Sequence, residues 1–165
     1  MDMTETMPNA KDRRSSASLV VRRAPSKRSV VNEFQARHLA ELCSLLVKRT
    51  LEHFEVESVE ELSDEDWESF TEMPEYGLFT TGVYACGFVC ADLKPDADLD
   101  AIRQRPIEAI QGANLPRLRH YVHTLMRSER AGYGYGSVVF EALRAGVLEQ
   151  LSERLDRGAD LYERL

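Results

Sequence analysis

The sequence predicts an all-α protein of about five to seven helices, and three observations predict it. Apolar residues recur at three- and four-residue steps through most of the chain after residue 30. Asn, Ser and Asp, the residue types that cap helices, stand just before several of these segments. Proline or glycine separates one segment from the next. The alternative is an α+β fold with a short strand pair near 78–91, where β-branched and aromatic residues gather.

The first helix is predicted to start at Asn32, because Gln35 three residues later completes a capping box, and to end between Lys48 and Phe54. Two short helical turns should follow Ser58 and Ser63, since carboxylates fill the first turn after each serine. Trp67 and Phe70 would anchor this acidic element on the core, and Pro74 would end it.

The stretch 78–91 is predicted to be a tightly packed helix because it contains Ala85, Gly87 and Ala91. Pro95 then breaks this helix, and Asp98 is predicted to cap a short helix that runs to Arg103 or beyond.

The C-terminal half is predicted to form three helices joined by glycines. The first has Pro116 as its first residue and runs to Arg130. Ser137 caps the second, which Gly146 ends or interrupts. The third continues from Val147 with helical spacing toward Leu165.

The composition fits one folded domain with a tail. The chain has 165 residues, 43% of them hydrophobic and 30% charged, which excludes a wholly disordered or collagen-like chain. Three cysteines are an odd and sparse set, so we expect reduced thiols rather than a disulfide framework. There is no N-terminal signal stretch and no apolar run near the ~20 residues of a membrane span, so we expect a cytoplasmic protein without a membrane partner.

The charges are strongly segregated. Residues 1–30 hold seven Lys or Arg against three acids and are predicted to be a disordered basic tail, with residues 31–165 forming a single helical domain. Residues 52–100 hold fifteen acids against the single base Lys94. The acidic run 52–76 is predicted to be either a solvated face or an interface for a basic partner. Nucleic acid could be bound only through the 1–30 tail, because the remainder of the chain is acidic.

Arg127 and Arg130 form the first candidate site. They lie one turn apart at the end of a predicted helix, beside the glycine-punctuated turn 132–136, so they could hold a phosphate or carboxylate with the help of His123. The alternative is structural, because cations also stabilise a helix C-terminus.

A metal site is the second candidate. Cys86 and Cys90 are one turn apart if their segment is helical, and His120 and His123 form an H-x-x-H pair, so the four could make a tetrahedral zinc site. Structural zinc sites more often use C-x2-C, and the two pairs belong to different elements. The sequence therefore favours no metal and no cofactor.

The last part of the chain has R-S-E-R at 127–130, then Gly136, Phe140-Glu-Ala-Leu-Arg-Ala-Gly146 and Leu151-Ser-Glu-Arg-Leu155. Over about residues 117–155 this arrangement resembles the C-terminal pattern of a family of small uncharacterised bacterial proteins, a domain of unknown function. The resemblance implies a bacterial, cytoplasmic, mainly helical protein, and it implies no activity or catalytic residues.

No nucleophile elbow or other catalytic constellation is present in the sequence. The sequence therefore favours binding over catalysis. We expect an accessory module that binds a protein partner through its acidic face and its basic tail; the alternative is a small anion-binding protein or enzyme that uses Arg127 and Arg130.

Overall fold

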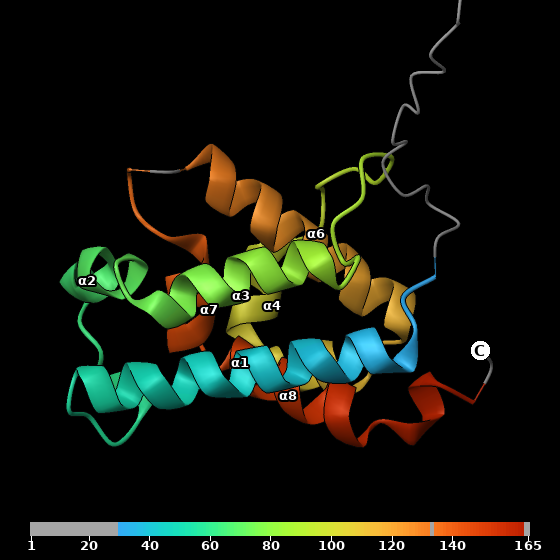
Figure 1. Ribbon diagram of the computed structural model, residues 1–165, viewed down its shortest axis with the longest axis horizontal. Coiled ribbons are helices and arrows are strands. Elements are labelled where there is room, and N and C mark those ends of the chain that lie inside the picture. The colour runs from blue at the N-terminus through green and yellow to red at the C-terminus, as the bar shows by residue number, and fades with distance from the viewer. Residues whose placement is uncertain (1–29, 133, 164–165) are drawn as a thin grey trace, which may run out of the picture.

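The computed structural model describes residues 30–132 and 134–163 and is all-α over them, with eight α-helices, three short 3₁₀ helices and no strand. The α-helices are α1 (Glu33–His53), α2 (Trp67–Thr71), α3 (Pro74–Ala85), α4 (Leu99–Gln104), α5 (Pro106–Gln111), α6 (Leu115–Ala131), α7 (Val138–Arg144) and α8 (Val147–Arg157) (Figure 1). The 3₁₀ helices are η1 (Val59–Glu61), η2 (Asp64–Asp66) and η3 (Ala159–Leu161). The all-α prediction is confirmed. The predicted tail, residues 1–30, lies outside the described residues except for Val30.

Helix α1 begins and ends where the sequence predicts. Asn32 Oδ1 accepts the Gln35 N–H at 2.8 Å, and Gln35 Oε1 accepts the Asn32 N–H at 2.9 Å, so both halves of the capping box are present. The buried side chains repeat at helical spacing: Ala36, Leu39, Ala40, Cys43, Leu46, Val47 and Thr50. This stripe faces the core, and the helix packs against α8 and α3.

The acidic segment after α1 forms short turns, as predicted. Ser63 Oγ accepts the Glu65 N–H at 3.3 Å and caps η2, and α2 follows directly. Phe70 is fully buried and Trp67 packs half-buried against the core. The prediction that Pro74 ends this element is wrong. Pro74 is instead the first residue of α3, because proline suits the first turn of a helix.

The helix predicted for 78–91 is correct only as far as Ala85. The Gly87 and Phe88 N–H groups donate to the carbonyls of Tyr84 and Val83 at 3.1 and 3.4 Å. Gly87 has a left-handed φ of 76°, so the pattern is a Schellman motif that stops the helix. Residues 86–91 are therefore not helical, and the predicted strand pair near 78–91 is wrong.

The remaining helices follow their predicted caps, with three differences. Pro106 starts a separate helix, α5, which is one reason why the structure has more helices than predicted. Asn114 Oδ1 caps α6 by accepting the Arg117 N–H at 3.0 Å, so this helix begins one residue before Pro116. Beyond Gly146, whose φ is 81°, α8 ends at Arg157 and only η3 follows it, while Leu165 lies outside the described residues.

One cluster of buried apolar side chains connects the helices from α1 to α8. Within it the rings of Phe70 and Phe140 lie 5.1 Å apart, and Tyr76 packs edge-on to Phe70 at 5.4 Å. Figure 1 shows α2 and the C-terminal end of α1 together at one end of the molecule, which places the acidic segment there. Within the described residues, no helix has the length and apolar character needed to cross a membrane.

Candidate functional site

The carboxylates of residues 52–76, here called the acidic face, point mostly into solvent. Nine of the eleven are exposed, and the other two, Asp66 and Glu75, are half-buried. Arg49 pairs with Glu52 at 3.0 Å and approaches Glu75 at 4.0 Å, and Arg144 pairs with Asp64. The other eight carboxylates have no ion pair with any described residue. The acidic face is therefore a largely uncompensated negative surface.

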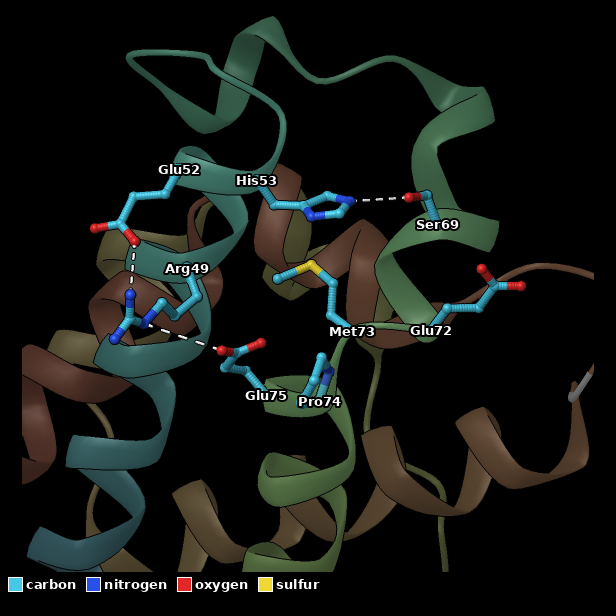
Figure 2. A pocket seen from close by; sticks show the side chains of 8 residues that line it. All are labelled: Arg49, Glu52, His53, Ser69, Glu72, Met73, Pro74 and Glu75. Carbon is cyan, nitrogen blue, oxygen red and sulfur yellow. Dashed lines mark hydrogen bonds and ion pairs between the residues drawn. The ribbon is translucent and has the colours of Figure 1, made fainter.

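A cavity of about 550 Å³ opens in the acidic face, between the end of α1 and the start of α3 (Figure 2). It is lined by Arg49, Glu52, His53, Ser69, Glu72, Met73, Pro74 and Glu75. Three carboxylates against one guanidinium leave the lining negative. The Arg49 guanidinium lies between Glu52 and Glu75, whereas Glu72 stands on the opposite side and is exposed.

His53 and Ser69 bridge α1 and α2 across the top of this cavity. His53 Nε2 lies 3.0 Å from Ser69 Oγ, which is hydrogen-bond distance. A serine nucleophile also needs a third group on the other ring nitrogen to orient the histidine. No described carboxylate forms a hydrogen bond or ion pair with His53, whose ring packs edge-on against Phe54 at 4.8 Å. The pair therefore joins two helices and offers polar atoms to a ligand, without the full constellation of a hydrolase.

Sequence patterns alone do not point to His53, Ser69 or Arg49 as site residues. His53 and Ser69 are 16 residues apart and belong to no recognisable motif. Only the path of the chain through η1 and η2 brings the end of α1 back to α2.

The four candidate zinc ligands, Cys86, Cys90, His120 and His123, are not gathered into one cluster suited to a metal. No group of three or more His, Cys, Asp or Glu side chains suited to a metal occurs among the described residues. Cys86 and Cys90 are buried free thiols. Both lie beyond the end of α3. Their segment is not helical, because the Schellman motif at Gly87 ends the helix at Ala85.

His120 and His123 instead hold the segment 86–98 onto α6. His123 Nδ1 accepts the Cys90 N–H at 3.2 Å, and His120 Nε2 lies 2.8 Å from Asp96 Oδ1 and 3.0 Å from the Lys94 carbonyl oxygen. Thr124 Oγ1 accepts the Ala97 N–H at 3.2 Å. The H-x-x-H pattern thus has a structural explanation. The two histidines form hydrogen bonds with backbone groups of the segment 86–98, which has no regular secondary structure to pair them.

Burial lowers the pKa of His123, and the nearby charges of Arg127, His120 and Arg119 lower it further. The side chain is 1% exposed, so the neutral ring is the form that fits this position. His123 is thus buried and bonded to the Cys90 N–H, and its role beside Arg127 and Arg130 in an anion site stays a prediction.

Arg127 and Arg130 are both exposed on the last turns of α6. Two carboxylates near them in the sequence are engaged elsewhere, since Glu129 is buried and Glu141 lies 3.7 Å from Arg144. Within residues 30–132 and 134–163, neither arginine makes an ion pair. Their proposed role in binding an anion stays a prediction.

A larger cavity, of about 880 Å³, lies at the other end of α1, beside Val31, Cys90, Leu115 and Leu161. Arg119 and Arg154 both line it, and Arg154 binds Asp160 with both terminal nitrogens at 2.8 Å and also donates to the Ala113 carbonyl. This pairing lowers the pKa of Asp160 and raises that of Arg154. The charges of Arg154 and Asp160 are therefore satisfied by each other.

In the comparisons with known proteins, no family model matches the chain, and no curated protein or solved structure is significantly similar to it. The resemblance between residues 117–155 and a bacterial family of unknown function stays a prediction.

Proposed function

We propose that this protein is a bacterial, cytoplasmic accessory module that holds a basic segment of a protein partner on its acidic face. The observation that carries the proposal is the set of eight exposed or half-buried carboxylates that have no ion pair with any described residue. Like charges held together destabilise a fold unless a partner neutralises them, and a concentrated field of one sign raises the encounter rate with the opposite charge.

The cavity in this face supports the same function. Glu72 and Ser69 present oxygen acceptors at its rim, and Arg49 occupies only the side near Glu52. A lysine or arginine side chain of the partner could donate to these acceptors and place its aliphatic part on Met73.

The test uses a fluorescent ten-residue lysine peptide and measures its affinity by anisotropy over a range of salt concentrations. Charge reversal at Glu68→Lys with Glu72→Lys should weaken binding about tenfold, which corresponds to about 1.4 kcal/mol. The control, Glu108→Lys with Glu163→Lys, makes the same change in net charge at exposed positions outside the acidic face. Equal losses for the two double variants, or an affinity that salt does not change, would contradict the proposal.

A second candidate function is the binding of an anionic ligand at Arg127 and Arg130, favoured by the absence of an ion pair at either side chain within the described part of the chain. Calorimetry with inorganic phosphate should detect heat with the natural protein and none with Arg127→Ala/Arg130→Ala. Because both side chains are exposed, the melting temperature should stay nearly unchanged. A large loss of stability would instead indicate a structural role.

A further inference from the structure

Helix α3 has an uncharged surface that no described element covers. From Tyr76 to Ala85 the helix has no charged residue, and only Phe79 and Val83 are fully buried. Gly77, Leu78, Thr81, Tyr84 and Ala85 are exposed and make up what we call the α3 outer face. Leu78 is 57% exposed and Tyr84 is 40% exposed.

This exposure is unusual for a helix of such composition. A helix that is apolar all round is normally buried on all sides. Here the inner side of α3 packs against α1, where Gly82 faces Leu42 so closely that an added Cβ would lie 2.2 Å from Leu42 Cδ1. Figure 1 shows α3 running across the front of the molecule beside α1. Contiguous exposed apolar surface is typical of interaction sites, and the exposed, uncharged side of α3 is a candidate for one.

The shape of the α3 outer face suits a second helix. Gly77, Thr81 and Ala85 are four residues apart and make a shallow row, and Leu78 and Tyr84 stand beside it as larger side chains. Rows at four-residue spacing are the grooves into which the ridges of another helix pack. The 12 residues of α3 give a length of about 18 Å, enough for roughly three turns of a partner helix.

The α3 outer face continues directly into the acidic face. Pro74 and Glu75, the first two residues of α3, line the cavity described above. A segment lying along α3 would therefore meet apolar surface over most of its length and carboxylates at one end. The complementary segment is an amphipathic helix with an apolar stripe and lysines or arginines at one end.

A second copy of the chain fits this surface less well. Each copy has a net charge of −7, so packing two copies together would oppose like charges.

We propose that the α3 outer face docks an amphipathic helix of a protein partner, with the basic end of that helix on the acidic face. The proposal rests on the proposed function and specifies its partner. Apolar side chains of the partner helix would pack against Leu78 and Tyr84 and supply the contact area. The contact between the basic end and the acidic face would decide in which direction the partner helix lies along α3.

The test is a selection of random peptides of about 16 residues on the full-length protein. Enriched peptides should contain apolar residues at helical spacing next to a cluster of lysines or arginines. Their affinity for Leu78→Glu and for Tyr84→Glu should fall tenfold or more. Ile107→Glu is the matched control, because Ile107 is 59% exposed on α5, away from this face. Equal melting temperatures would show that the variants fold.

The outcomes separate this inference from the proposed function. If no peptide is enriched, or if Leu78→Glu and Ile107→Glu have equal effects, the docking of a helix on α3 is wrong. If Glu68→Lys/Glu72→Lys weakens binding while the α3 variants do not, the proposed function stands and the inference fails. If the α3 variants weaken binding and salt has no effect on the affinity, the apolar contact with α3 is upheld, and the contact between the basic end and the acidic face is wrong. A dimer of the natural chain that Leu78→Glu abolishes, measured by light scattering, would show that a second copy is the occupant and would overturn the proposal.

Discussion

The carboxylate of Glu129 accepts a hydrogen bond from the hydroxyl of Tyr76 at 2.6 Å, across 53 residues of sequence. Glu129 lies near the end of α6 and is only 7% exposed. The same carboxylate accepts the Ser137 hydroxyl at 2.6 Å and the Val139 N–H at 3.0 Å. One buried acid thus joins the start of α3, the end of α6 and the N-terminus of α7, where a negative charge is favourable.

Replacing this acid should be costly. Glu129→Ala leaves the Ser137 hydroxyl and the Val139 N–H without their buried acceptor and removes an acceptor of Tyr76, so the free energy of unfolding should fall by about 3 kcal/mol. Urea denaturation followed by circular dichroism measures it. Glu141→Ala, which removes an exposed partner of Arg144, should cost no more than about 0.5 kcal/mol. A similar small loss for Glu129→Ala would show that the cluster does not stabilise the fold.

Stability should depend on the protonation of His123. Its pKa in the folded protein is lowered from 6.5, first by burial and then by Arg127, His120 and Arg119, so the unfolded chain binds the proton more readily. The stabilisation is fully present above pH 6.5 and is lost as the pH falls from there toward the lower folded value. A protonated Nδ1 also cannot accept the Cys90 N–H.

Denaturation at several pH values between about 5 and 8 checks this expectation. His123→Asn keeps an acceptor near the Cys90 N–H and does not titrate, so it should flatten the profile in this window. His38→Asn, at an exposed position of α1, should leave the profile unchanged. If the stability of the natural protein does not change between pH 5 and 6.5, the assignment of this pH dependence to His123 is contradicted.

Two glycines of α3 should respond oppositely to substitution. Gly82→Val places a side chain against Leu42 and should destabilise the protein by about 1–3 kcal/mol through overpacking. At Gly77 an added Cβ meets nothing within 4 Å, so Gly77→Ala should stabilise the helix by roughly 0.5–1 kcal/mol. Thermal unfolding compares the two variants. If Gly82→Val does not lower the melting temperature, the close contact between α1 and α3 is not as described.

Much of the helical structure could be predicted from local sequence. The capping side chains of Asn32, Asp98 and Ser137 each accept the backbone N–H three residues later, as their positions indicate. Such caps depend only on residues within one turn, so the sequence contains all the information about them. The segregation of charge between residues 1–30 and 52–100 is likewise read directly from the chain.

The candidate site needed the tertiary structure. The contact between His53 and Ser69, the burial of Glu129 and the uncovered side of α3 all depend on which helices meet, and no local pattern encodes that. The same holds for His120 and His123, whose spacing fits a metal site but whose ring nitrogens face the segment 86–98. Sequence by itself determined where the helices capped by Asn32, Asp98 and Ser137 begin and which surface is charged, because capping and charge are local properties. Only the packing of distant segments decided which polar groups are buried and which apolar side chains remain in solvent.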